Sequence, residues 1–73
     1  MTVRLNYMHP AGPVKTREFN NIRDAAKYGV AHYLTDNGYA SPKTAGYAAS
    51  VYIETGSAYV DGIEFWDEEE EAA

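Results

Sequence analysis

The dipeptide Asp61-Gly62 restricts the possible folds of this chain more than any other feature of its sequence. It separates two short runs, SAYV and IEFW, in which polar and apolar residues largely alternate. Asp-Gly is a favoured pair for a two-residue type I′ turn, which joins two antiparallel strands into a hairpin. The sequence therefore predicts a hairpin over residues 57–66, with three cross-strand pairs: Val60 with Ile63, Tyr59 with Glu64, and Ala58 with Phe65.

This register assigns each side chain of the hairpin to one side of the sheet, because side chains alternate along a strand. The residues expected to face the core are Ala58, Val60, Ile63 and Phe65. The residues expected on the opposite side are Tyr59, Glu64 and Trp66. A single strand with a bulge at Gly62 is the alternative for the same segment.

The first 19 residues predict a second hairpin. In residues 2–8, TVRLNYM, apolar and polar residues alternate as in a half-buried strand. Residues 9–13 contain two prolines and a glycine and are predicted to form a turn. Residues 14–19, VKTREF, follow as the second strand, although their alternation is less regular.

A helix is predicted within residues 19–38, because apolar residues recur there at helical spacing. Asn20 or Asn21 is a suitable N-cap, and Gly38 supplies the left-handed residue that ends many helices. The face expected against the core consists of Ile22, Ala25, Ala26, Gly29, Val30 and Tyr33.

Residues 41–56 are compatible with two structures. Ser41 as an N-cap, Pro42 at the first helical position and Gly56 as a stop favour a helix. The core face of this helix would consist of Ala45, Ala48, Ala49, Tyr52 and Ile53. The run SVYIET, residues 50–55, is rich in β-branched and aromatic residues and would also suit a strand. The helix is preferred because it accounts for more of the segment, and its alanines would allow close approach to the first helix.

Together these elements predict an α+β fold in the order ββααββ: a small antiparallel sheet of two hairpins, with two helices packed on one face. A chain of 73 residues forms one domain with a small core, and this chain has no cysteine for a disulfide. We expect the domain to span residues 1–66. Residues 67–73 are expected to form a mobile acidic tail, because consecutive acids repel one another.

Charge is divided unevenly along the chain, whose net charge is −5. All six Lys and Arg residues occur at or before Lys43, whereas residues 44–73 contain eight acids and no Lys or Arg. A polarised charge distribution is informative about partners rather than about fold. The C-terminal segment would repel phosphates, so we expect its partner to be a basic protein surface rather than nucleic acid.

No catalytic or cofactor-binding signature occurs in the sequence. His9 and His32 lack further ligands at the spacing of a zinc site, and the glycines form no phosphate-binding loop. We therefore expect no enzymatic activity, no cofactor and no metal. The first residues lack the apolar segment of a signal peptide, and no run approaches the ~20 apolar residues of a membrane span. The expected location is cytoplasmic, without a membrane partner.

The candidate partner-binding surface combines aromatic side chains with carboxylates in a segment that has no basic residue. Arginine-rich partners bind such surfaces through cation–π contacts and carboxylate–guanidinium pairs. The residues predicted to form the surface are Glu54, Tyr59, Asp61, Glu64, Trp66, Asp67, Glu68, Glu69, Glu70 and Glu71. A solvated tail that only aids solubility is the alternative for the acidic run.

In size, charge and composition the chain resembles the small acidic proteins that phages and mobile elements encode against host defences, such as anti-CRISPR proteins and DNA mimics. The resemblance rests on the length, the absence of cysteine, the seven tyrosines and the acids that follow Trp66. It implies a non-enzymatic inhibitor that binds a nucleic-acid-handling effector and blocks its guide or target site. The basic N-terminal half departs from a fully acidic mimic, which leaves a one-sided acidic patch.

Three other possibilities are open at this point. The tyrosines could form the interface of a homo-oligomeric structural or regulatory module, for example a homodimer. The first hairpin could contact nucleic acid through basic residues, namely Arg4, Lys15, Arg17 and Lys27. The basic strands could also neutralise the acidic strands across the sheet.

Overall fold

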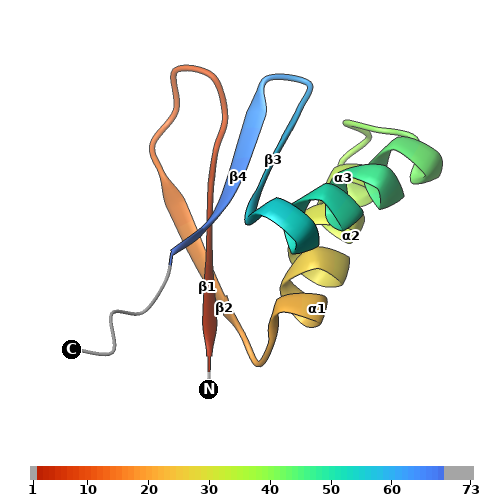
Figure 1. Ribbon diagram of the computed structural model, residues 1–73. Coiled ribbons are helices and arrows are strands. Elements are labelled where there is room, and N and C mark those ends of the chain that lie inside the picture. Colours follow the sequence, from red (N-terminus) through yellow and green to blue (C-terminus); the bar gives the residue numbers. More distant parts are fainter. Residues whose placement is uncertain (1, 69–73) are drawn as a thin grey trace.

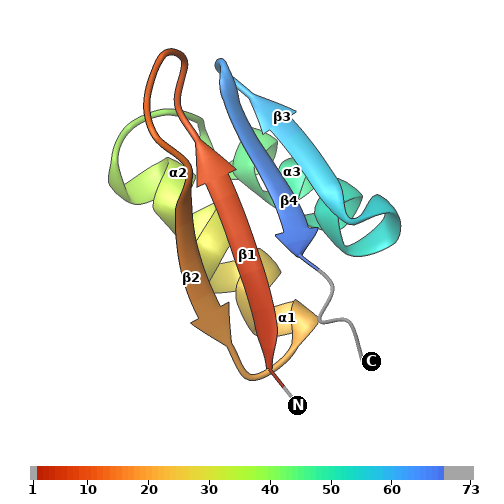
Figure 2. The same cartoon turned by 90° about the vertical axis from the view of Figure 1, so that its left-hand side faces the viewer.

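The computed structural model describes residues 2–68, which form two layers (Figure 1). One layer is a four-stranded antiparallel sheet in the order β2-β1-β4-β3. Its strands are β1 (Val3–Met8), β2 (Lys15–Phe19), β3 (Ser57–Val60) and β4 (Ile63–Glu68). The helices lie along one face of the sheet and leave the other face uncovered (Figure 2). The α+β class and the predicted order of strands and helices are confirmed.

The turn between β3 and β4 has the predicted type I′ geometry. Asp61 and Gly62 have φ values of 53° and 82°, and positive φ at both central residues is characteristic of this turn. The cross-strand pairs are also the predicted ones, which excludes the bulged single strand: Val60 with Ile63, Tyr59 with Glu64, and Ala58 with Phe65.

The first and last strands of the chain lie side by side at the centre of the sheet. β1 pairs with β2 on one side and with β4 on the other, both in antiparallel register. Tyr7 of β1 lies opposite Phe65 of β4, and their ring centroids are 6.2 Å apart. This pairing joins two hairpins, each of which would be only marginally stable alone, into one sheet.

The predicted domain boundary at Trp66 lies inside β4 and needs correction. Asp67 pairs with Leu5, and Glu68 pairs with Arg4. The backbone N–H of Asp67 also donates a hydrogen bond to the carbonyl oxygen of Gly56, at 2.9 Å. The two acids extend the strand because β1 offers them backbone partners, which outweighs their mutual repulsion. The remainder of the predicted tail, residues 69–73, lies outside the described part of the chain.

The first helix is continuous but changes its hydrogen-bond pattern along its length. It comprises α1 (Ile22–Asp24), the π-helix η1 (Ala25–Ala31) and α2 (His32–Asp36). Asn21 is the N-cap, since its side-chain Oδ1 accepts a hydrogen bond from the N–H of Asp24 at 2.8 Å. The N–H of His32 donates to the carbonyl oxygen of Lys27, five residues earlier, as in a π-helix. The apolar spacing did not distinguish these wider turns from an α-helix.

The second helix, α3, spans Pro42–Thr55, so the strand alternative for residues 50–55 is excluded. Its N-cap is Ser41, whose hydroxyl accepts a hydrogen bond from the N–H of Thr44 at 3.3 Å. Both helices end on a left-handed glycine, as predicted: φ is 74° at Gly38 and 84° at Gly56.

The core lies between the two helices and the covered face of the sheet. It consists of Leu5, Ala25, Ala26, Val30, Leu34, Ala45, Ala48, Tyr52, Ala58, Ile63 and Phe65. Two predictions need correction: Ile53 is 46% exposed, and Leu34 is fully buried although it was not assigned to the core. Ile53 is exposed because α3 places the neighbouring Tyr52 against the sheet, and adjacent residues on a helix point in different directions.

Gly29 sets how closely the first helix approaches the sheet. A Cβ atom built at Gly29 would overlap the Leu5 Cδ2 atom and would lie 2.9 Å from Phe19 Cε2. Leu5 is fully buried, so its side chain has no free space into which it can move. A glycine is therefore required here by packing. By contrast, nothing lies within 4 Å of a Cβ built at Gly46 in α3.

Alanine substitutions at these two glycines should have opposite effects on stability. At Gly29 the destabilisation from overpacking the core exceeds the stabilisation from the higher helix propensity of alanine. We therefore expect Gly29→Ala to lower the free energy of unfolding by about 1–2 kcal/mol. Gly46→Ala should raise it by about 0.5–1 kcal/mol, because only the helix propensity changes. Urea unfolding followed by circular dichroism measures both, and shifts of the same sign would contradict the packing argument.

Candidate partner-binding surface

The uncovered face of the sheet is defined by the register of its four strands. Because side chains alternate, residues that pair across the strands share a face. The residues on the uncovered face are Arg4, Asn6 and Met8 of β1, Thr16 and Glu18 of β2, Ser57 and Tyr59 of β3, and Glu64, Trp66 and Glu68 of β4. This face therefore carries three carboxylates and one guanidinium.

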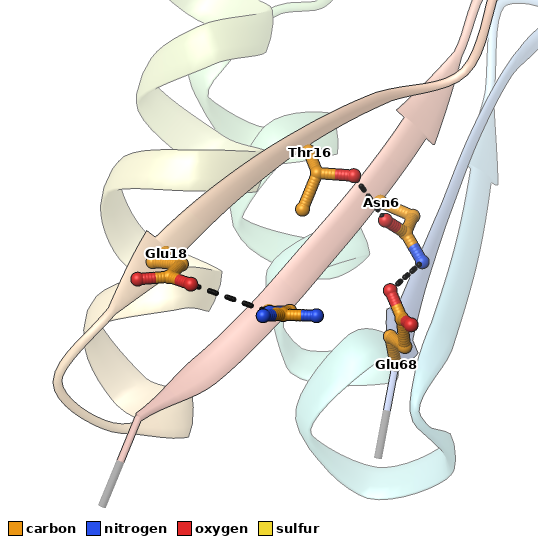
Figure 3. Close-up of polar contacts among 5 residues, drawn as sticks. Asn6, Thr16, Glu18 and Glu68 are labelled. Carbon is orange, nitrogen blue, oxygen red and sulfur yellow. Dashed lines mark hydrogen bonds and ion pairs between the residues drawn. The ribbon is translucent and has the colours of Figure 1, made fainter. Parts of the chain in front are cut away.

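A polar network occupies the middle of the uncovered face (Figure 3). The Thr16 hydroxyl donates to Asn6 Oδ1 at 2.6 Å, and Asn6 Nδ2 donates to Glu68 Oε1 at 3.2 Å. Asn6 is only 7% exposed, so these hydrogen bonds satisfy a buried amide. They also hold the carboxylate of Glu68 against the sheet, which reduces its freedom to contact a partner.

Arg4 neutralises part of the acidic charge on this face. Its Nε atom lies 3.3 Å from Glu18 Oε2, and the pair is partly exposed. The register also places Arg4 between Glu18 on β2 and Glu68 on β4. This ion pair lies within the first hairpin, whereas the alternative from the sequence concerned neutralisation of the acidic C-terminal strands. An exposed pair of this kind adds little to stability.

The outer part of the uncovered face, on β3 and β4, has a different character. Tyr59 is 69% exposed and lies directly opposite Glu64, whose carboxylate forms no ion pair with any residue in the range 2–68. Trp66 is half-buried and lies opposite the small residue Ser57. A concavity of about 520 Å³ around the edge strand β3 is lined by these four residues, by Ala58 and Phe65 of the covered face, and by Val51 and Thr55 of α3. We call Ser57, Tyr59, Glu64 and Trp66 the hairpin surface.

The structure brings together only part of the predicted site. Tyr59, Glu64 and Trp66 share the hairpin surface, and Glu68 lies on the same face but is bound by Asn6. Two acids lie nearby on other elements: Glu54 is exposed on α3, and Asp61 is exposed in the turn at the end of the hairpin. Three acids of the prediction, Glu69, Glu70 and Glu71, lie outside the described residues.

Asp67 points away from the hairpin surface, because it pairs with the core residue Leu5 on the covered side of the sheet. Its neighbour there is Tyr52, which is fully buried and whose hydroxyl has no hydrogen-bond partner within residues 2–68. Burial raises the pKa of the Tyr52 phenol well above its usual value near 10, and the charge of Asp67 adds to this effect. Asp67 therefore lies on the covered side of the sheet and is not part of the hairpin surface.

Two further findings concern residues that the sequence did not assign to the site. A second concavity of about 320 Å³ lies between α3 and β3, and its lining includes Tyr47, Val51 and Tyr59. Tyr47 is 72% exposed, more than any other large apolar side chain among residues 2–68. Tyr47 and Val51 are four residues apart and hence share a helix face. The sequence already shows that Tyr47 and Val51 share a helix face, but it does not show which strand lies beside that face.

The basic residues of the first hairpin do not form one patch. Arg4 lies on the uncovered face, whereas Lys15 and Arg17 alternate to the other side of β2. The Arg17 guanidinium lies 5.0 Å from the centre of the Phe19 ring, and the Lys27 ammonium lies 5.3 Å from the centre of the Tyr28 ring. The structure therefore gives no support to a nucleic-acid surface that combines all four basic residues.

The histidines are engaged with tyrosines. The Nε2 atom of His9 lies 2.5 Å from the hydroxyl of Tyr33, and the ring of His32 lies 5.3 Å from that of Tyr28. Within residues 2–68, no three side chains of the types His, Cys, Asp and Glu are grouped as metal ligands would be. The same part of the chain contains no helix with the length and apolar character needed to cross a membrane.

Comparison of the chain with protein-family models, with curated proteins and with solved structures gave no match. Function must therefore be inferred from the geometry and charge of the surface itself.

Replacing Tyr52 by phenylalanine should not destabilise the protein at neutral pH, because it removes a buried hydroxyl that has no partner. Above pH 10 the unfolded tyrosine releases its proton while the folded residue keeps it, so the wild type should lose stability as the pH rises. Tyr52→Phe should lose less stability at alkaline pH than the wild type. The loss that remains should come from Tyr33, because burial also raises the pKa of its phenol. Urea unfolding at neutral and alkaline pH measures this difference.

The control is Tyr47→Phe, which alters an exposed phenol and should reproduce the wild-type stability at both pH values. A loss of more than about 1 kcal/mol in Tyr52→Phe at neutral pH would show that the hydroxyl has a favourable partner in the folded protein.

Proposed function

We propose that the chain is a non-enzymatic binding protein that uses its hairpin surface to occupy a basic region of a partner protein. The observation that supports this proposal most directly is the strand order, which keeps the charge asymmetry of the sequence in space. β2 with its basic residues lies at one edge of the sheet, and β3 lies at the other edge. Residues 44–68, which contain no Lys or Arg, therefore form one side of the molecule.

Charge complementarity favours a basic partner over a neutral or acidic one. Glu64 on the hairpin surface has no internal counter-ion in the described chain, and Asp61 and Glu54 lie on the adjoining turn and helix. Exposed carboxylates of this kind attract a basic surface over about 8–10 Å at physiological salt. The adjacent rings of Tyr59 and Trp66 add the aromatic contact area that is typical of binding surfaces.

A nucleic-acid-binding effector is the partner class that we propose. Its basic groove normally holds phosphates, and spaced carboxylates beside aromatic rings can take their place. The chain would then act as an inhibitor in the manner of anti-CRISPR proteins. Because β2 carries basic residues at the opposite edge, only one side of the molecule is suited to such a groove.

A charge reversal at Glu64 tests the proposal. The immobilised full-length chain should capture a basic nucleic-acid-binding protein from a host lysate at low salt and release it at high salt. We expect Glu64→Lys to weaken the captured complex about tenfold or more, because a repulsive charge replaces an attractive one at the contact. The purified partner should also bind its nucleic acid less well when the chain is added.

The matched control is Asp36→Lys, which makes the same change of charge at the exposed end of α2, on the helical layer rather than on the uncovered face of the sheet. It should leave capture unchanged. If Glu64→Lys still captures the partner, or if both variants lose it equally, the hairpin surface is not the binding surface.

The groove between α3 and β3 favours a second candidate, a homo-oligomer with a tyrosine-rich interface. Tyr47 and Tyr59 line the groove and are 72% and 69% exposed. Exposed apolar side chains that line one groove are typical of an interaction surface. Acids beside the groove would oppose self-association, because two copies would bring like charges together.

Sedimentation velocity at tens of micromolar protein separates the two candidates. If the chain self-associates through the tyrosines, a dimer should persist at high salt, and Tyr47→Ser should convert it to a monomer. A monomer at these concentrations would reject the homo-oligomer and leave the binding protein as the remaining candidate.

A further inference from the structure

The hairpin surface combines two aromatic side chains with a carboxylate on the same face of one strand pair. Ser57 and Tyr59 on β3 lie opposite Trp66 and Glu64 on β4, so the four side chains occupy the corners of a rectangle. Tyr59 and Trp66 are on one diagonal, a separation that aromatic side chains can span. A planar group that stacks on an aromatic ring lies about 3.5–4.0 Å from it. Ser57 is small and leaves this space open.

Glu64, at the fourth corner of the rectangle, determines which charge a bound group can carry. Among the carboxylates of the uncovered face, Glu18 is paired with Arg4 and Glu68 accepts from Asn6. Glu64 is exposed and has no ion-pair partner within residues 2–68. A cation that binds beside the two rings would meet this carboxylate directly, whereas an anion would be repelled.

Side-chain recognition is also favoured over the addition of a partner strand to β3. The Thr55 hydroxyl lies 3.0 Å from the carbonyl oxygen of Ser57 and 3.3 Å from its nitrogen, and it hydrogen-bonds both groups. These groups are the ones that a partner strand would use at this end of β3. The remaining free edge is too short for a long strand, which is a common protection against unwanted pairing.

We propose that Tyr59, Trp66 and Glu64 form a binding site for an arginine side chain of the partner. A guanidinium is planar, stacks on aromatic rings and forms two parallel hydrogen bonds with a carboxylate. A lysine ammonium carries the same charge but is compact and strongly hydrated, so it gains less between two rings. This inference rests on the proposed function and specifies the residue by which the basic partner would be recognised.

The fluorescence of Trp66, the single tryptophan of the chain, reports on the site. The probes are three otherwise identical Gly/Ser peptides that carry four arginines, four lysines or four citrullines, the last being planar but neutral. We expect the arginine peptide to shift the Trp66 emission and to bind about five- to thirtyfold more tightly than the lysine peptide, with the citrulline peptide weakest. Amide chemical shifts of Ser57 and Tyr59 provide a second readout.

Glu64→Gln and Tyr59→Ala should each reduce the preference for arginine over lysine to less than about twofold. Asp36→Asn is the matched control, because it removes an exposed carboxylate at the end of α2, outside the rectangle, and should keep the preference. Circular dichroism establishes that each variant is folded.

Equal binding of the arginine and lysine peptides would overturn the arginine site but leave the proposed basic partner intact, since charge alone would then suffice. An equal loss of preference in Glu64→Gln and Asp36→Asn would also overturn the site. If none of the three peptides binds and no salt-sensitive partner is captured from a lysate, both the site and the proposed function are wrong.

Discussion

The pairing of β1 with β4 is the interaction on which the rest of this structure depends. The two hairpins are local units, and neither has enough apolar surface to be stable alone. Their union places Leu5 of β1 and Phe65 of β4 in one layer, and both are almost completely buried under the helices. Gly29 of the first helix approaches this layer closely at Leu5.

The same pairing determines what kind of surface the chain presents. Because the hairpins lie side by side, β2 and β3 become opposite edges, and the charge asymmetry of the sequence is preserved across the sheet. It also brings Asn6 next to the last residues of β4, where its side chain donates a hydrogen bond to the carboxylate of Glu68. The acidic surface is therefore concentrated at the outer strand pair, where Glu64 lies beside Tyr59 and Trp66.

Much of the fold and about half of the candidate site could be predicted because they depend on local interactions. The Asp61-Gly62 turn defined the register of its hairpin, and this register correctly placed Tyr59, Glu64 and Trp66 on one face. Capping residues such as Asn21 and Ser41 correctly located the helix starts. The face of Asp67 and the hydrogen bond to Glu68 could not be predicted, because both depend on β1, which is more than fifty residues away in the chain. The groove at Tyr47 was missed because it depends on how α3 packs beside β3, which the periodicity of each element does not show.

The sequence by itself determined the turns, the helix ends and the alternation of each strand. These features are decided within a few residues by backbone φ preferences, capping hydrogen bonds and side-chain periodicity. Only the tertiary structure decided which strands are neighbours, which acids have partners and where an open concavity remains. Those outcomes depend on contacts between distant segments, whose free energy comes from burying a shared core rather than from any local preference. For this protein, the tertiary structure therefore distinguishes Glu64, which is exposed and available to a partner, from Glu18 and Glu68, which are bound by Arg4 and Asn6.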